Sequence, residues 1–235
     1  VIMEKLKKFI VNLKVAGKLK AYRVTVLTMT VFLVAVALIS TLVIRSNVKR
    51  ITAVWSPAIG YIQELETLTT EYRVKQYQHL VESDAAVMAA CEKEIESIAG
   101  QITENCKALS EIINADAEAQ KGQADYDKAI AAWEDYKSFS EEIIRLSTAG
   151  KQAEASDIMT GSAYEKYTSF RNVFSTLRDE FQVELDSSKL AANVCTVIIF
   201  IVISAAGIAI AAATTFIGKV ITDSIIEPVA QIDTA

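Results

Sequence analysis

Two long apolar runs without a charged residue enclose a polar segment in this chain. The first run covers residues 24–44 and the second covers residues 190–218. An α-helix rises about 1.5 Å per residue, so about 20 apolar residues cross a hydrocarbon core roughly 30 Å thick. Both runs reach this length, and they predict two transmembrane helices.

The segment between the runs, residues 45–189, carries 16 Lys+Arg and 25 Asp+Glu, so it is expected to lie in water. The predicted layout is a basic N-terminus (1–23), a first span (24–44), a soluble domain (45–189), a second span (190–218) and a short C-terminal segment (219–235).

Charge asymmetry predicts the orientation of this layout. Residues 1–23 hold seven Lys+Arg against one acid, Glu4. Lys and Arg that flank a span are retained on the cytoplasmic side. Both ends are therefore expected in the cytoplasm and residues 45–189 outside it. A cleaved signal peptide is the alternative, because Ala35 and Ala37 fit a cleavage site. The apolar run continues to Ile44, however, beyond the length of a usual signal core.

Within the soluble segment the apolar residues recur at alternating four- and three-residue steps, which is typical of helices packed in a bundle. The pattern predicts helices at about 51–83, 85–114, 123–148 and 162–188, with a short helical piece at 152–160. The fold class is therefore expected to be all-α, an antiparallel extracytoplasmic four-helix bundle whose first and last helices continue the spans. The expected seam of the second helix is Cys91, Ile95, Ile98, Ile102, Asn105, Leu109 and Ile112.

Local signals predict where these helices bend and end. Pro57 should bend the first helix, because proline has no N–H to donate. Asp84 is placed to cap the second helix. Gly150 suits a helix end that needs a positive φ.

Several kinds of chemistry have no support in the sequence. The acidic middle segment disfavours nucleic-acid binding, which needs clustered Lys and Arg. Cys91 and Cys106 are too far apart along one helix for a disulfide. One histidine and no metal-ligand spacing leave no metal site, and no catalytic motif is found. We expect no cofactor, no catalytic residue and no enzymatic activity.

Short motifs then give a resemblance to a family. Residues 12–19, Asn-Leu-Lys-Val-Ala-Gly-Lys-Leu, resemble the start of methyl-accepting chemotaxis proteins that carry a four-helix-bundle sensor domain. The Tyr72-Arg73 and Tyr77-Gln78-His79 run is similar to the first bundle helix of that family. Ala149-Gly150-Lys151 resembles its Ala-Gly-Asp loop, with Lys151 in place of Asp. Residues 221–232 resemble the opening of a HAMP domain, with Pro228 as its proline.

The resemblance implies the ligand-sensing input module of a bacterial chemoreceptor in the inner membrane. It implies a small-molecule ligand or a ligand-loaded binding protein as partner, and a homodimer. A downstream kinase and coupling protein would act only through residues beyond Ala235. The signal would pass from the second span through Lys219 and Pro228 into the HAMP domain. The alternative is the input half of a sensor histidine kinase or a diguanylate cyclase, which share this layout.

The candidate ligand site lies where the seam of the first helix turns polar. Buried polar groups cost free energy unless they are paired, so such a layer suggests a wet structural layer or a pocket. Matching heights on the other helices add residues near Lys137 and Tyr164, and Arg73 is expected to pair the anionic group of a ligand. The alternative for Arg73 is a solvated arginine paired with Glu66 or Glu71. His79 is expected to be a packing or capping residue, with a sensing role as the alternative. The full predicted set is Thr69, Arg73, Gln76, Tyr136, Lys137 and Tyr164.

Overall fold

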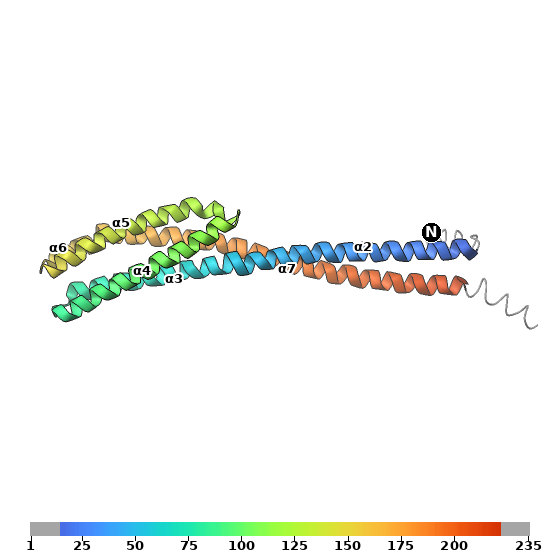
Figure 1. Ribbon diagram of the computed structural model, residues 1–235, viewed down its shortest axis with the longest axis horizontal. Coiled ribbons are helices and arrows are strands. Elements are labelled where there is room, and N and C mark those ends of the chain that lie inside the picture. The colour runs from blue at the N-terminus through green and yellow to red at the C-terminus, as the bar shows by residue number, and fades with distance from the viewer. Residues whose placement is uncertain (1–14, 222–235) are drawn as a thin grey trace, which may run out of the picture. The chain divides into compact units, whose positions relative to one another are not determined.

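The computed structural model describes residues 15–221, and every element within that range is helical (Figure 1). The described residues form two compact units, one of residues 47–190 and one that combines the segments up to residue 46 and from residue 191. The elements are α2 (Val15–Arg50), η1 (Ile51–Trp55), α3 (Ser56–Val81), α4 (Ala85–Ala115), η2 (Ala119–Gly122), α5 (Gln123–Thr148), α6 (Gln152–Thr160) and α7 (Ser162–Ile221).

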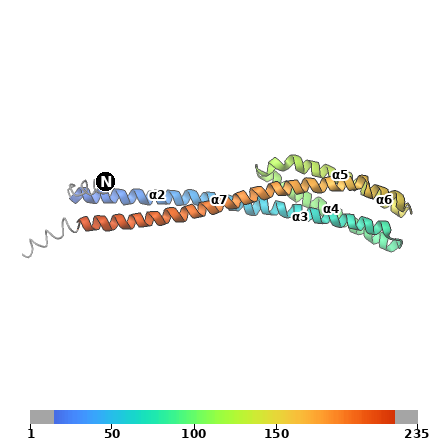
Figure 2. The same cartoon turned by 180° about the vertical axis from the view of Figure 1, so that it is seen from behind.

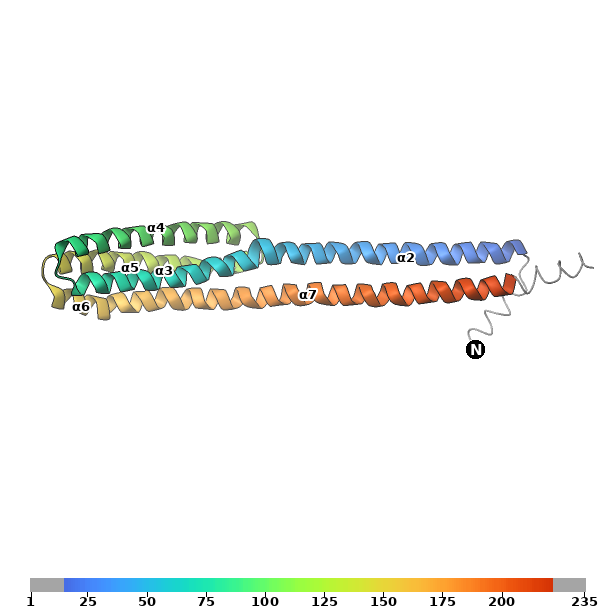
Figure 3. The same ribbon diagram turned by 90° about the horizontal axis from the view of Figure 1, so that it is seen from below.

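Residues 47–190 form an antiparallel bundle of α3, α4, α5 and the first part of α7 (Figures 1 and 3). The short helix α6 lies at the end where α3 ends and α4 begins, which we call the distal end. The interior is filled by one apolar face from each helix, as the spacing of the sequence predicts. Its largest fully buried aliphatic and aromatic side chains include Ile62, Leu65, Ile102, Leu109, Ile143, Phe170, Phe174 and Leu177.

The buried face of α4 departs from the predicted seam in its second half. Cys106 and Ile113 are buried where the sequence pattern placed Asn105 and Ile112. A straight helix has 3.6 residues per turn, so a seam drifts around it unless the chain alternates three- and four-residue steps consistently. The step from Ile102 is four residues here, which turns Asn105 toward the edge of the interface.

A π-helical turn lies immediately before Pro57, where the sequence predicted a bend. Ser56 donates its N–H to the carbonyl of Ile51, five residues earlier, and Pro57 follows at once. Because proline has no N–H, the ladder is interrupted at that position in any case, and a widened turn accommodates the interruption. Trp55, in this turn, is fully buried in the bundle and contacts Phe181, with a ring-centroid distance of 5.5 Å.

The predicted helix ends at Asp84 and Gly150 are both confirmed. The Asp84 carboxylate accepts hydrogen bonds from the N–H groups of Ala86 and Val87, at 2.7 and 3.3 Å. Gly150 has a φ of 76°, which a residue with a Cβ adopts only with strain. These two positions therefore fix where α4 begins and where α5 turns toward α6.

In the other unit, α2 and the C-terminal part of α7 lie side by side (Figures 1 and 2). Each is long and apolar enough to cross a membrane. Their large apolar side chains point outward rather than into a core, among them Leu27, Phe32, Leu42, Phe200 and Ile208. Exposed apolar surface on this scale is unfavourable in water.

Candidate functional site

Four polar side chains of α3 are buried in the distal half of the bundle. They are Thr69, Arg73, Gln76 and His79, and the most accessible of them, Arg73, is only 8% exposed. The spacing of four, three and three residues keeps them on the same face of α3 as Leu65 and Tyr72. Apolar packing therefore gives way to a polar interior at this end of the bundle, as the sequence predicted.

Arg73 is held by a carbonyl and by aromatic rings. Its Nη2 donates to the backbone carbonyl of Met159 on α6, at 2.9 Å, and to the Tyr77 hydroxyl, at 3.1 Å. Its guanidinium carbon lies 5.1 Å from the ring centroids of Tyr77 and Tyr164 and 4.9 Å from that of Tyr167. A cation near aromatic faces is attracted by their quadrupoles, more strongly where water is excluded.

No carboxylate among the described residues forms an ion pair with Arg73, although Glu66 and Glu71 were the expected partners for a solvated arginine. Glu66 instead pairs with Arg178 of α7, at 2.6 Å. The interpretation of Arg73 as a solvated surface arginine is therefore wrong, because three tyrosines and α6 cover it. Its Nη1 is buried and has no hydrogen-bond partner within the described part of the chain.

Gln76 carries the second buried donor that has no hydrogen-bond partner within the described residues. Its Oε1 accepts a hydrogen bond from the Tyr136 hydroxyl of α5, at 2.5 Å, and this bond fixes the orientation of the amide. Its Nε2 is buried and makes no hydrogen bond within residues 15–221. Burial raises the pKa of Tyr136 well above its ordinary value, although the nearby Arg73 acts in the opposite direction. The phenol therefore keeps its proton and acts as the donor.

Arg73 Nη1 and Gln76 Nε2 are thus buried donors that the described residues leave without acceptors. An unmade hydrogen bond at a buried donor costs about 1–3 kcal/mol, and more for a charged group. A negatively charged acceptor is the kind of group that such donors bind, and beside Arg73 it would also neutralise the guanidinium. The same tyrosines that cover Arg73, Tyr164 and Tyr167, also line an adjacent polar cavity of about 360 Å³ with Arg171 and Arg178 of α7 and Glu66 of α3.

The predicted site residues divide into two groups in the structure. Arg73, Gln76, Tyr136 and Tyr164 come together, and Tyr164 is still 51% exposed although its ring covers Arg73. Thr69 is buried on the same face, but its hydroxyl donates to the carbonyl of Leu65 in its own helix. Lys137 instead lines a groove of about 500 Å³ between α4 and α5, with Tyr72 and Ser140.

Three residues around Arg73 were not among the predicted site residues: Tyr77, Met159 and Tyr167. Tyr77 had a usable signal, because residues four apart share a helix face. Met159 and Tyr167 come from α6 and α7, and only the packing of these helices brings them to α3. Of the predicted relay residues, Lys219 is exposed on α7, and Pro228 lies outside the described residues.

A model for a protein family described as a four helix bundle sensory module for signal transduction matches residues 12–194. The match begins before the first apolar run and ends just inside the second. It therefore includes the whole bundle and every residue of the candidate site. No curated protein matches the chain.

Proposed function

Because the chain belongs to the family of four-helix-bundle sensory modules of methyl-accepting chemotaxis proteins, we propose that it detects a small anionic ligand in the distal half of its bundle. The ligand would be a carboxylate or a similar anion. It would accept hydrogen bonds from Arg73 Nη1 and Gln76 Nε2, and Tyr164 would form the movable outer wall of the site.

The observation that carries this proposal is the pair of buried donors without acceptors, one of them charged. Buried cations are normally paired with a carboxylate, and buried amides normally make their hydrogen bonds. Cation–π contacts alone could hold Arg73 as a structural residue, but they do not satisfy Gln76 Nε2. An anionic ligand accounts for both groups at once.

Signal transmission follows from the continuity of α7. Met159, at the end of α6, and Tyr164 and Tyr167, at the start of α7, contact Arg73. An anion that draws the guanidinium toward itself would change these contacts, and α7 would respond with a small sliding displacement, as packed helices do. The displacement would pass along α7 toward Lys219 and the HAMP-like segment after it.

We propose that α2 and the C-terminal part of α7 cross the inner membrane, with both chain ends in the cytoplasm and the bundle outside. Their outward apolar side chains support this. Threonine hydroxyls of these segments are also satisfied within the helix, as a span in hydrocarbon requires, although exposed threonines of the bundle such as Thr67 and Thr103 bond in the same way. In the two segments the threonine hydroxyl donates to the backbone carbonyl four residues earlier, over 2.7–2.9 Å. These threonines are Thr28, Thr30, Thr41, Thr196, Thr214 and Thr215.

The test is a thermal-shift screen of the full chain in lipid nanodiscs against mono-, di- and tricarboxylates, with alkylamines of matched size. A ligand that binds only the folded state raises the melting temperature by mass action. The proposal expects carboxylates among the ligands that raise it. Calorimetry on Arg73→Met should then show at least a tenfold loss of affinity, because a charge-assisted hydrogen bond contributes about 1.5–3 kcal/mol.

Two further variants separate binding from folding. Arg145→Ala removes an exposed α5 arginine that pairs with Glu142 and should leave affinity unchanged. Gln76→Glu places a carboxylate three residues from Arg73 on the same helix and should compete with the ligand while the bundle stays folded. A carboxylate that binds Arg73→Met or Gln76→Glu as tightly as the parent chain would place its site elsewhere.

A further inference from the structure

His79 lies in the last turn of α3 and is fully buried. Its Nδ1 is 3.1 Å from the hydroxyl oxygen of Ser147 on α5, and its Nε2 is 3.1 Å from a carboxylate oxygen of Glu92 on α4. Both ring nitrogens therefore face oxygen atoms, from two different helices. The hydrogen bonds that these two oxygens make therefore decide which ring nitrogens carry a hydrogen.

The Ser147 hydroxyl has a second partner that decides its role. It lies 3.2 Å from the backbone carbonyl of His79, to which it donates. This carbonyl is in the final turn of α3, where helical N–H donors run out. The N–H of Ser83, which would have been its helical donor, instead donates to the Glu82 side chain, at 2.8 Å. Ser147 thus ties the end of α5 to the end of α3.

A hydroxyl has one proton, so Ser147 can accept from Nδ1 only if Nδ1 carries a hydrogen. Glu92 accepts from Nε2 only if Nε2 carries one as well. With the Glu92 carboxylate ionised, the full set of contacts requires the imidazolium form of His79. Of the two neutral forms, the Nδ1–H tautomer sets the Nε2 lone pair against the Glu92 carboxylate and is disfavoured. The Nε2–H tautomer keeps the bond to Glu92, but the Ser147 proton must then turn to Nδ1. The carbonyl of His79 loses its donor, and the tie between α5 and α3 is broken.

The other charged groups near His79 have partners elsewhere, so Glu92 is the acidic group that faces the ring. On α3, Lys75 is one turn before His79 and pairs with Glu94 of α4, at 2.5 Å, while Glu82 accepts the N–H groups of Ser83 and Asp84. On α4, the Cys91 thiol is buried beside Glu92.

From α5, the Thr148 hydroxyl is within 3.5 Å of the Glu92 oxygen that faces His79. Gln152, the first residue of α6, donates to the carbonyl of Ser147, at 3.4 Å. Elements α3, α4 and α5 therefore meet at this one ring, and α6 is connected to it through Ser147.

We propose that the bundle binds a proton at His79 as a second stimulus, independent of the anionic ligand, and that release of this proton detaches the end of α5 from the end of α3. The protonated state holds the distal end closed, and this closure is lost as the pH rises through the titration of the ring. The module would in this way report the acidity of the compartment that its bundle faces.

The chain offers an unusually direct measurement, because His79 is its only histidine. The full chain, purified through a tag without histidine and placed in nanodiscs with ¹³C-labelled imidazole, gives one ring resonance to follow between pH 5 and 8.5. The proposal expects this resonance to titrate. In Glu92→Gln the ring should hold its proton about tenfold more weakly, which lowers the midpoint by about one pH unit.

Glu94→Gln is the matched control, because this carboxylate lies two residues away and pairs with Lys75. It should leave the midpoint in place. Glu92 is 44% exposed, so its substitution does not threaten the fold. A ring that does not titrate in this range, or an equal midpoint in the two variants, would overturn the proposal.

The hydrogen bond from Ser147 to the His79 carbonyl is tested by amide hydrogen exchange at the α5–α6 turn, corrected for the intrinsic dependence of exchange on pH. Protection should fall with rising pH in the parent chain and be low at every pH in Ser147→Ala, which cannot donate to the His79 carbonyl. Protection in His79→Gln, whose side chain does not ionise, should not depend on pH. A pH-dependent protection that survives in His79→Gln, or a titrating ring with constant protection in the parent, would show that the proton does not control the tie.

Discussion

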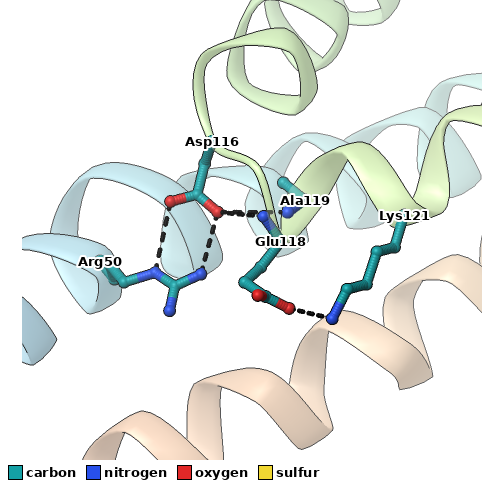
Figure 4. A network of polar contacts seen from close by, with 5 residues as sticks. All are labelled: Arg50, Asp116, Glu118, Ala119 and Lys121. Carbon is teal, nitrogen blue, oxygen red and sulfur yellow. Dashed lines mark hydrogen bonds and ion pairs between the residues drawn. The ribbon is translucent and has the colours of Figure 1, made fainter.

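Arg50 and Asp116 are 66 residues apart in the sequence, and their side chains form a two-bond ion pair at the end of the bundle opposite α6 (Figure 4). Arg50 Nη2 donates to Asp116 Oδ1, at 3.0 Å, and Arg50 Nε donates to Oδ2, at 3.3 Å. Asp116 Oδ1 also accepts the N–H groups of Glu118 and Ala119, at 2.9 and 3.2 Å. One carboxylate thus ties the last residue of α2 to the turn that leads into η2.

Replacement of Asp116 by alanine should lower the free energy of unfolding by about 1.5–3 kcal/mol, because both the bidentate pair and the cap are lost. Glu118→Ala is the control, since its ion pair with Lys121 is exposed and should contribute less than about 1 kcal/mol. Urea denaturation of the two variants measures the difference. Equal losses would show that the pair to Arg50 adds nothing beyond a surface contact.

The same pair predicts a loss of stability in acid. Burial alone raises the pKa of Asp116, but the hydrogen bonds from Arg50, Ala119 and Glu118 outweigh it and lower this pKa below its ordinary value. A carboxyl with a lowered pKa stabilises the fold above its unfolded-state pKa, about 4, and loses this contribution as the pH falls through the folded-state value. Between pH 5 and 2 the parent chain should therefore lose more stability than Asp116→Asn. Parallel curves of melting temperature against pH would contradict this.

Gly122, the last residue of η2, is a position where a side chain does not fit without movement of its neighbours. A Cβ there would lie 2.5 Å from Leu177 Cδ1 and 3.2 Å from Phe181 Cε1. Gly122→Ala should destabilise the bundle by about 1–3 kcal/mol, because these core side chains must move. Gly100, on the exposed side of α4, has no atom within 4 Å of its Cβ position. Gly100→Ala should be neutral or stabilise by up to about 1 kcal/mol, and denaturation curves that rank the two variants otherwise would refute the argument.

The proposed topology predicts the labelling of single cysteines in intact cells, in a background where Cys91, Cys106 and Cys195 are replaced by alanine. A membrane-impermeant maleimide should modify a cysteine at Gln120, which is exposed. It should miss cysteines at positions 10 and 230 until the cells are permeabilised, because these ends are expected in the cytoplasm. Modification of either end in sealed cells would reverse or abolish the topology.

A homodimer through α3 is the remaining proposal about partners. Val74 is a large apolar residue of α3 with 57% of its surface exposed, so a cysteine there can meet its counterpart in a second copy. Oxidation should crosslink Val74→Cys between chains in membranes and leave Gln101→Cys, exposed on α4, uncrosslinked. Trp55, at the other end of this face, is unsuitable for such a probe because it is buried in its own bundle. Equal crosslinking at both positions would indicate random collision.

The sequence by itself determined the helices, their ends and the two long apolar segments. Helix period and the length of an apolar run are local properties, so they are visible without knowledge of the fold. The caps behave in the same way: Asp84 bonds to N–H groups two and three residues later, and Gly150 needs only its own φ. The polar layer on α3 was equally visible, because all of its members belong to one helix.

Only the tertiary structure decided what surrounds that layer. Counting along antiparallel helices gave Tyr136 and Lys137 the correct height, but successive residues point about 100° apart around a helix. Tyr136 therefore reaches Gln76, while Lys137 faces the groove between α4 and α5.

The burial of Arg73 by Tyr164 and Tyr167, and the contacts of His79 with Glu92 and Ser147, depend on how the helices pack. Side chains that meet across helices leave no periodic signal in a single chain. The sequence could therefore point to Arg73 and His79, and only the packing revealed the partners on which their proposed roles depend.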